Sequence, residues 1–566
     1  MSGASGPAAK AAPAPRHSAS LIVLRDGAQG LQVLMLRRAE RAGDQNSGAA
    51  VFPGGHLDRA DMRAHPLCIG LDDAQASARL RIADGGLNYW IAALRECFEE
   101  SGLLVAVDAS GGWADLDALG DQATVMALRQ RLNAGDVDIA AVCVQHGWRL
   151  ATDRVQYFSH WLTPPGRPKR FDTRFFVAIA PPQQRASADE TESAELMWLK
   201  PADALAAERG LKLMLVTEET LRTLSKFERA ADAMTFAAQA RDVPLMMPRI
   251  GSNATGMRPV LPTHWAYAEI GRLDAEGRGD VGLELVPGRA VQLSPRIVRV
   301  TADNGSVMTG PGTNSYFVGD AGGPCALIDP GPDDAAHVQA LLAAAPGPIT
   351  RILVTHTHKD HSPAAQALKA ATGAALFGRV ANFSEWQDTT FKPDTALTHG
   401  ERIALGADTT LRVVHTPGHA SNHLCYLLEQ EKLLFTGDHL MQGSTVVINP
   451  PDGDMQAYLQ SLRALLDVDL EWLAPGHGFL IDQPHDVVHK TIAHRLQREA
   501  KVVAAIEQLG RGDVDALLPV VYADVSPRLH AVAARSLRAH LHKLRADGRA
   551  DEIDGQWSLC GRPGEA

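Results

Sequence analysis

Residues 352–364 read ILVTHTHKDHSPA, a short apolar run followed by three histidines and an aspartate. The apolar and β-branched residues predict a buried strand over 351–355. Ser362 and Pro363 form a typical helix start, so we expect a helix to begin there with Ser362 as its N-cap. The polar cluster then lies in the turn at the carboxyl end of the strand: His356, His358, Asp360 and His361. Because imidazole and carboxylate groups bind zinc-like ions, this turn predicts a metal site.

One turn does not complete two coordination spheres, so further ligands must come from later parts of the chain. His356 and His358 can converge on one ion, and Asp360 and His361 can approach a neighbouring ion. Three more candidates each follow an apolar run and stand beside glycine, where the backbone can turn tightly: His419, Asp438 and His477. We therefore expect a binuclear site, in which two ions roughly 3.5–4 Å apart hold a bridging hydroxide.

The order T-H-T-H-K-D-H, T-P-G-H, G-D-H, P-G-H-G resembles the metallo-β-lactamase superfamily over about 291–500. The stretches GPGTNSYFVG (310–319) and LIDPG (327–331) match its opening strands. The resemblance implies an αββα sandwich and two Zn²⁺ or similar transition-metal ions. It implies that His356, His358 and His419 hold the first ion, that Asp360, His361 and His477 hold the second, and that Asp438 bridges them. Asp360 and Asp438 are then catalytic as well, because the metal-bound hydroxide attacks an ester, thioester, amide or phosphodiester.

Two further histidines adjoin these motifs. His423 either supports the ligands from behind or lies at the surface. His439 follows Asp438 directly, and alternation along extended chain predicts that its side chain points elsewhere.

The tail 501–566 predicts a winged-helix-like unit. Within 526–549 one helical stripe is apolar, with Leu529, Val532, Ala533, Leu537, Leu541 and Leu544. The opposite face is basic, with Arg528, Arg535, Arg538, Lys543, Arg545 and Arg549. The order of metal domain, helix and winged tail is similar to the superfamily branch that includes a single-strand-preferring endoribonuclease. Glyoxalase-II-type thioesterases share the metal motifs but carry a different C-terminal part. The basic face is equally consistent with a solvated helix and with single-stranded RNA binding.

A second dense stretch, ALRECFEESGLLV (93–105), places Glu96, Glu99 and Glu100 on one helix face. Three like charges at this spacing destabilise a helix unless cations neutralise them. The sequence R-E-C-F-E-E-S-G-L resembles the core of the Nudix motif. This resemblance implies an α/β/α sandwich and Mg²⁺ or Mn²⁺ bound by the three glutamates, which are metal-binding and catalytic, so that water attacks a diphosphate in line. Arg95 would orient a glutamate.

The Nudix box is split. Gly55 is followed at the expected distance by Asp61, where the motif has glutamate, but 33 residues rather than seven separate Asp61 from Arg95. The split box, the leading VFPGG and the stretch 159–178 resemble the peroxisomal coenzyme A diphosphatase branch over about 17–240. The coenzyme A signature is only partly matched, because Asp44 stands where an arginine is usual. The general base is either a motif glutamate or a residue outside the motif.

The bulk properties fit a multidomain globular protein of α/β and α+β class. The 566 residues carry a net charge of −11, which argues against wholesale electrostatic binding of nucleic acid, and the six cysteines form no C-x-x-C pair. We expect a disordered leader over 1–16, a Nudix domain over 17–245, a linker or packing segment over 246–290, the metal domain over 291–500 and the tail. The absence of a signal peptide and of a long apolar run predicts a soluble, cytoplasmic protein with no membrane partner.

Three functional hypotheses follow. In the first, both halves are hydrolases acting on related small molecules of nucleotide or acyl-coenzyme A type, one on a thioester and the other on a diphosphate. In the second, the C-terminal half is a ribonuclease and the Nudix half trims nucleotide products. In the third, the Nudix half senses a ligand without hydrolysing it; the intact glutamates count against this reading.

Overall fold

The computed structural model describes residues 13–40, 47–189, 193–239 and 242–560. Residues 1–12 of the predicted leader and Asp44 of the coenzyme A signature lie outside these ranges. The chain divides into two compact units, one formed mainly by residues up to Ile250 and the other mainly by residues from Gly251 onward. Pro259–Pro262 and Glu276–Arg278 belong to the first unit.

The N-terminal unit is built on one mixed sheet, with described strands in the order β10-β3-β2-β1-β8-β7-β11. Its strands are β1 (Arg16–Gly27), β2 (Gly30–Arg38), β3 (Ala49–Val51), β4 (Gly54–His56), β7 (Gln156–Leu162), β8 (Phe171–Ile179), β9 (Ser193–Leu199), β10 (Lys212–Leu213) and β11 (Leu245–Met246). β4 pairs with β1, and β9 with β2. β1 and β2 form an antiparallel hairpin, in which Gly27 pairs with Gly30.

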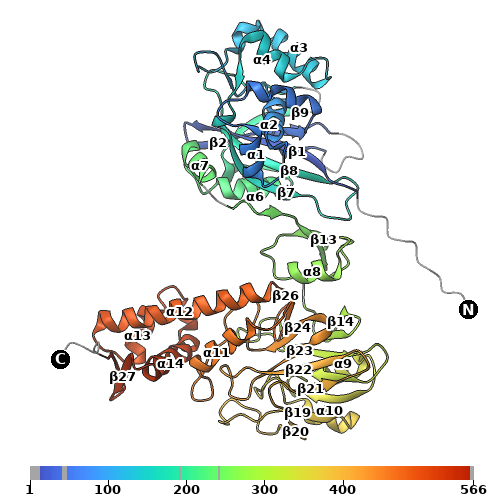
Figure 1. Cartoon of the computed structure of the whole chain (residues 1–566), viewed down its shortest axis with the longest axis vertical. Helices are drawn as coiled ribbons and strands as arrows, with labels where there is room; N and C mark the ends of the chain where they lie inside the picture. The colour runs from blue at the N-terminus through green and yellow to red at the C-terminus, as the bar shows by residue number, and fades with distance from the viewer. Residues whose placement is uncertain (1–12, 41–46, 190–192, 240–241, 561–566) are drawn as a thin grey trace, which may run out of the picture. The chain divides into compact units, whose positions relative to one another are not determined.

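Two apolar cores cover opposite faces of this sheet. One contains α2 (Gly86–Ser101), and the other contains α6 (Leu215–Leu224) and α7 (Ala230–Ala238). This is the α/β/α sandwich expected for the Nudix half (Figure 1). α6 and α7 are separate helices, because residues 225–229 between them are not helical.

Two insertions surround α2. The first, between β4 and α2, carries η1 (Arg59–Leu67) and α1 (Asp73–Leu80). The second, between α2 and β7, carries β5 (Ala106–Val107), η2 (Leu116–Leu119), α3 (Gln122–Asn133), α4 (Ile139–His146), β6 (Arg149–Leu150) and η3 (Thr152–Arg154). Because α1 packs against α2, the first insertion folds back on α2 rather than separating it from β4. α5 (Pro201–Leu205) and η4 (Ala207–Arg209) follow β9.

The C-terminal unit contains two sheets. The first runs β14 (Ala290–Ser294), β15 (Ile297–Thr301), β16 (Asn314–Gly319), β17 (Cys325–Ile328), β18 (Ile349–Leu353), β19 (Ala375–Gly378) and β20 (Thr395–Ala396). The second runs β21 (Arg402–Ala404), β22 (Thr410–His415), β23 (Leu424–Leu428), β24 (Leu433–Gly437), β25 (Trp472–Pro475) and β26 (Ile481–Asp482). η5 (Glu429–Glu431) joins β23 to β24.

One apolar core lies between the two sheets, and one lies on each outer face. The first outer core includes α9 (Ala335–Ala344) and α10 (Ala365–Thr372), and the second includes α11 (Met455–Leu465) and part of α12 (Pro484–Leu509). The architecture is therefore the expected αββα sandwich (Figure 1). The predicted start of α10 is wrong: its N-cap is Ala364, because the Ser362 hydroxyl donates to Asp388 (2.8 Å) instead of capping the helix.

The segment expected to link or pack, 246–290, contains β12 (Arg249–Asn253), β13 (Gly256–Val260) and α8 (Tyr267–Leu273). Glu269 of α8 receives two hydrogen bonds from the buried Arg299 of β15, at 2.6 and 2.8 Å. It also accepts one from the backbone of Leu480 at 2.9 Å. These bonds fix α8 to the metal domain.

Three helices and a hairpin end the described chain: the distal part of α12, α13 (Val514–Val521), α14 (His530–Ala546), β27 (Ala550–Ile553) and β28 (Gln556–Leu559), with η6 (Pro527–Leu529) before α14. They share an apolar core of their own, which gives the predicted winged helix. None of the helices in the described part of the chain has the length and apolar character needed to cross a bilayer.

Candidate metal centres

The first group of candidate ligands consists of His356, His358 and His419. The first two follow β18, and His419 lies in the loop after β22. The Nδ1 atom of His358 is 3.0 Å from Nε2 of His356 and 3.0 Å from Nε2 of His419. Three ring nitrogens therefore converge at a spacing that suits a tetrahedral ion with bonds of about 2.0–2.1 Å.

The second group consists of Asp360, His361, Asp438 and His477. Asp438 follows β24 and His477 follows β25, so the ends of three strands meet at one edge of the sandwich. Oδ1 of Asp438 is 3.4 Å from Nε2 of His361 and 3.3 Å from Nε2 of His477. Its other oxygen, Oδ2, is 3.7 Å from Nε2 of His419. Asp438 thus faces both groups with different oxygens.

The opposite ring nitrogens of these histidines are already occupied. Nδ1–H donates to Asp329 in His361 (2.9 Å), to the Val447 carbonyl in His419 (2.7 Å) and to the Gly312 carbonyl in His477 (3.1 Å). Thr355 donates its hydroxyl proton to Asp329, so its oxygen accepts from Nδ1–H of His356 (3.0 Å). These contacts leave the Nε2 atom of each of the four histidines facing the other donors, and partners of this kind usually orient metal-binding histidines.

Charge is distributed unevenly between the two groups. Burial and neighbouring imidazoles lower the pKa of His358 to about 3 and hold that of His356 well below its usual value. Burial would also lower the pKa of His477, but Asp438 and Asp360 raise it to about 9. The first group is neutral and donor-rich, whereas the second pairs imidazoles with carboxylates.

The donor set fits two cations. Nε2 of His361, Nε2 of His477 and Oδ1 of Asp438 are buried without a hydrogen-bond partner. Buried polar atoms without a partner are costly, and an ion at this point would satisfy all three. Mixed imidazole and carboxylate donors are those expected for zinc-like ions.

The two neighbouring histidines differ in their surroundings. His423 is fully buried, its Nε2 accepts from the backbone N–H of Asp438 (3.2 Å), and its Nδ1–H donates to Thr416 (2.9 Å). It supports the Asp438 turn and does not lie at the surface. The His439 ring is buried beside Tyr458, with centroids 5.0 Å apart, and belongs to neither donor group.

In the N-terminal unit, α2 carries Glu96, Glu99 and Glu100, and Gly102 ends the helix in a left-handed conformation. The backbone N–H of Gly54 donates to Glu100 at 2.9 Å. Gly55 lies directly beside Glu96, because an added Cβ would be 2.4 Å from its carboxyl group and would force that side chain to move. The β4 strand thus lies directly on the glutamate face, as the split motif requires.

Arg95 lies among these acids. Its guanidinium contacts Asp61 (2.9 Å), Glu96 (2.8 Å) and Glu99 (3.2 Å). Burial raises the pKa of Glu99 to about 7 despite this cation. Within the described residues, the three glutamates do not form a convergent group comparable to those of the C-terminal half, because Arg95 stands between the carboxylates.

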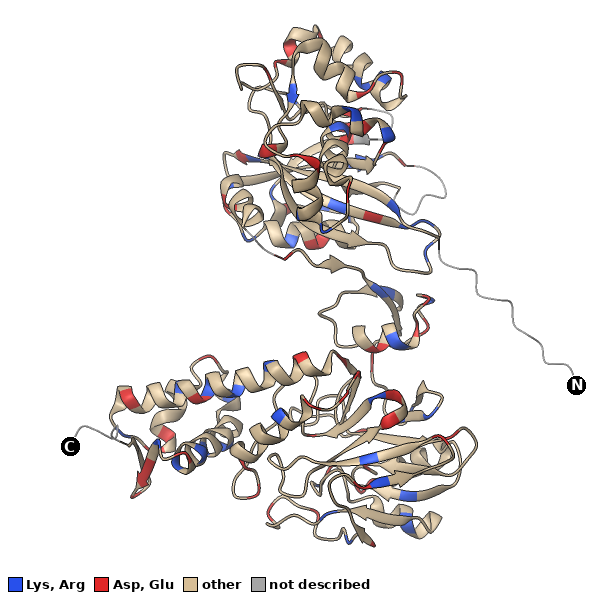
Figure 2. Cartoon of the chain, in the orientation of Figure 1, with Lys and Arg blue, Asp and Glu red and all other residues tan. Residues whose placement is uncertain are grey.

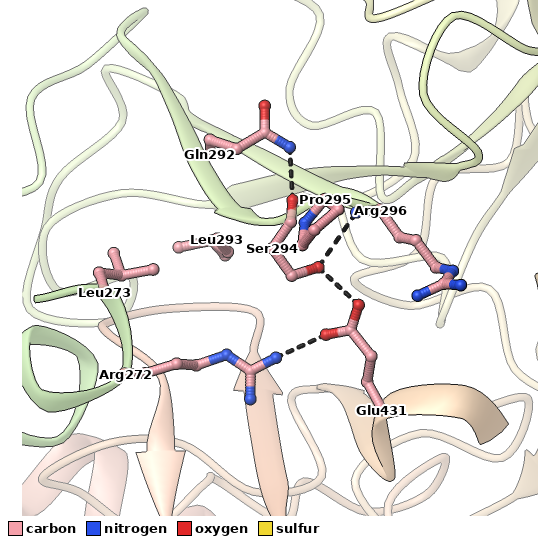
Figure 3. Close-up of a pocket in the computed structure, with 8 residues that line it drawn as sticks. All are labelled: Arg272, Leu273, Gln292, Leu293, Ser294, Pro295, Arg296 and Glu431. Atoms are coloured by element: carbon pink, nitrogen blue, oxygen red, sulfur yellow. Dashed lines mark hydrogen bonds and ion pairs between the residues drawn. The ribbon is translucent and has the colours of Figure 1, made fainter. Parts of the chain in front are cut away.

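A large surface hollow, of about 620 Å³, lies away from these residues (Figure 3). Its polar side chains are paired with one another: Glu431 accepts from Arg272 (2.5 Å) and from Ser294 (2.6 Å), as the dashed lines show. Nothing in its lining matches the chemistry of the two donor groups.

Comparison with known proteins agrees with this arrangement. Residues 308–477 match the metallo-beta-lactamase superfamily, 514–557 the beta-lactamase associated winged helix domain, and 71–216 the NUDT19 Nudix domain.

Three of the relatives each match part of this chain. The beta-lactamase-like protein 2 homolog of Drosophila melanogaster is 31% identical over 47% of this chain and 93% of its own length. The homolog of that protein in Caenorhabditis elegans is 28% identical over 45% of this chain and 86% of its own. The atrochrysone carboxyl ACP thioesterase of Aspergillus fumigatus is 32% identical over 39% and 67%.

The folds and domain matches define a metal-dependent hydrolase. The chain belongs to the metallo-beta-lactamase superfamily through its C-terminal half, and it carries a Nudix domain of the NUDT19 type in its N-terminal half.

Proposed function

We propose that the C-terminal half hydrolyses an acyl ester or thioester with two transition-metal ions, zinc being the best match to the donors. His356, His358 and His419 hold one ion, Asp360, His361 and His477 hold the other, and Asp438 bridges them. The placement of Asp438, with one oxygen toward each group, carries this proposal. When bound, such an ion pair supplies a water-derived nucleophile at neutral pH and polarises the carbonyl that is attacked.

An acyl substrate is supported by two observations. One relative is named as an ACP thioesterase. In addition, the loops that flank the two donor groups expose large apolar side chains: Val307, Met308, Val380, Phe383 and Trp386. In the loop that carries Val307, the Gly312 carbonyl accepts a hydrogen bond from His477. In the loop that carries Trp386, Gln387 forms a β-bridge with His358. An apolar acyl group beside the scissile carbonyl would cover these side chains.

The ribonuclease alternative is less well supported, because half of the six basic residues predicted to form one face over 526–549 are ion-paired. Lys543 and Arg549 pair with Glu499 (3.0 and 2.8 Å), Arg545 pairs with Glu552 (3.4 Å), and Arg535 lies over the Trp386 ring at 4.8 Å. Arg528 and Arg538 have no ion pair within the described chain. Figure 2 shows only basic residues among the charged positions of α14, and acidic residues on α12 and the wing, from which Glu499 and Glu552 pair with them. The mixture of charges favours a solvated surface over a phosphate-binding stripe.

For the N-terminal half we propose hydrolysis of a diphosphate in a nucleotide-type substrate such as coenzyme A. Glu96, Glu99 and Glu100 would bind Mg²⁺ or Mn²⁺, displacing Arg95 from between them while Asp61 keeps hold of its guanidinium. Acyl-coenzyme A carries both a thioester and a diphosphate, so one small molecule would suit both halves.

The test uses the full chain with three variants: Asp438→Asn, the double variant Glu99→Gln/Glu100→Gln, and Asp408→Asn as an exposed-carboxylate control. Each is assayed on acyl-coenzyme A, free coenzyme A and single-stranded RNA. We expect Asp438→Asn to lower thioester hydrolysis by at least about 100-fold and to leave diphosphate hydrolysis intact, with the converse for the glutamate variant. RNA cleavage lost in Asp438→Asn, without any thioesterase activity in the wild type, would establish the alternative instead.

A further inference from the structure

Arg495 on α12 is a buried cation at an unusual place. Its residue is 3% exposed, and a buried guanidinium requires partners for its donors. Nη2–H donates to the backbone carbonyl of Val446, and the guanidinium lies 5.4 Å from the ring of Tyr458. Arg495 thus extends from the helix that leads to the winged tail into the metal domain.

Val446 lies in a segment without regular secondary structure, between β24 and α11. Such a segment lacks ladder hydrogen bonds to fix its carbonyl groups. The next residue, Val447, offers the carbonyl that accepts Nδ1–H of His419 at 2.7 Å. This bond sets the tautomer and orientation of His419, whose Nε2 faces His358 at 3.0 Å. Arg495 therefore holds the peptide adjacent to the one that aims His419.

A second branch runs through Tyr458. Its hydroxyl donates to the backbone carbonyl of His439 (2.9 Å), next to Asp438. Its backbone also lies against Gly418, where an added Cβ would be 2.3 Å from the Tyr458 Cα, so the residue before His419 fits only as glycine. Tyr458 thus contacts the chain on both sides of the site, through its hydroxyl group at His439 and through its backbone at Gly418.

We propose that Arg495 is a positioning residue for the first metal group. It acts through Val446 and Val447 on His419 and, less directly, through Tyr458 on the turn that carries Asp438. The proposal rests on the metal role of His419 given above and adds that the helix leading to the winged tail contributes to metal affinity.

The test compares full-length variants with a matched control on the same helix. Arg495→Met removes the donors and keeps the unbranched stem of the side chain, Arg495→Gln restores a donor group without charge, and Arg495→Lys restores the charge on a single nitrogen. Arg498→Met is the control, because Arg498 is also buried but bonds to Val521 and Asp524, away from the metal loops. Zinc affinity is measured for each site by competition with a chromophoric chelator, and cobalt absorption spectra report ligand geometry.

We expect Arg495→Met to weaken one of the two zinc sites by 10- to 100-fold, as loss of an orienting partner usually does, with an altered cobalt spectrum. Lysine or glutamine should restore part of the affinity. Arg498→Met should lower the unfolding temperature without changing either zinc site.

Unchanged zinc affinities in Arg495→Met, or an equal loss at both sites that Arg498→Met reproduces, would overturn the proposal. If Arg495→Met does not fold, Arg495→Gln is judged by the same criteria. The variant His419→Ala tests the metal role of His419 separately from the positioning role of Arg495. If this variant also leaves both zinc affinities unchanged, the metal role of His419 fails, and the positioning role of Arg495 fails with it.

Discussion

Asp61 stands where the Nudix motif usually has the longer glutamate, and its shorter side chain still contacts the rest of the split motif. It is 1% exposed, accepts from Nε of Arg95 at 2.9 Å, and also accepts from the backbone N–H of Asp58 at 2.8 Å. The carboxylate thus anchors both the start of the inserted η1 helix and the arginine of the glutamate face. Its position in sequence left this role open, because 33 residues separate it from Arg95.

We expect Asp61→Asn to destabilise the N-terminal unit by about 3 kcal/mol, because removing one partner leaves a largely buried cation undercompensated. Diphosphate hydrolysis should fall with it. Urea unfolding followed by tryptophan fluorescence measures the change. Asp61→Glu, which restores the usual motif residue, is the comparison, and an Asp61→Asn protein that unfolds like the wild type would show that Glu96 and Glu99 suffice for Arg95.

Among the elements, α14 contains a buried histidine whose titration affects the stability of the fold. Its apolar stripe buries Leu537, Leu541 and Leu544 as predicted, but Leu529 is exposed because it precedes the helix. His540 lies fully inside, with no hydrogen-bond partner for either nitrogen. Burial, together with Arg495 and Lys543, lowers its pKa to about 3.

This shift predicts acid lability with a defined sign. The folded state disfavours protonated His540, whereas the unfolded chain binds the proton near pH 6.5. The stability contribution is therefore complete above that pH and decreases as the pH falls from about 6.5 toward 3, by about 1.4 kcal/mol per pH unit. His540→Phe should flatten this part of the stability profile in chemical unfolding, and the exposed control His489→Phe should not. Equal slopes in both variants would contradict the prediction.

Some of these elements and contacts could be predicted from sequence patterns, and others could not. The glutamate helix and the strand before the histidine cluster follow from local pattern, although the strand is Ile349–Leu353 rather than the predicted 351–355. The candidate ligands follow from motif order, and their side chains lie together in two groups. The start of α10 does not follow, because Asp388 competes for the Ser362 hydroxyl from 26 residues away. The hydrogen bonds from the histidines to the carbonyls of Gly312 and Val447 could not be predicted either, because backbone acceptors carry no sequence signature. The role of Asp329 as the acceptor for His361 was not predicted. LIDPG offered a partial signal, as Asp329 adopts a left-handed φ of 50° beside Pro330.

For the whole molecule, the proposed metal sites lie in two compact units and predict two separable responses to chelation. If zinc occupies the C-terminal site, its removal leaves the buried donors unsatisfied, so the unfolding transition of that unit should move to lower temperature. The loss is about 4 kcal/mol per ion when free zinc is 1,000 times Kd. Differential scanning calorimetry with EDTA, followed by zinc addition, measures it. The N-terminal transition should be unaffected by zinc, and a chelator that moves neither transition would argue against bound ions.

The 26-residue helix α12 is long enough to extend about 39 Å. Its first part packs in the metal domain through Val488, and its last part packs in the winged tail through Val502 and Ile506. A single rod embedded at both ends leaves no hinge at which the tail could swivel. A partner that displaces the tail would therefore move α12 as a rigid body. In the metal domain, this movement would first reach the loop whose Val446 carbonyl accepts a hydrogen bond from Arg495.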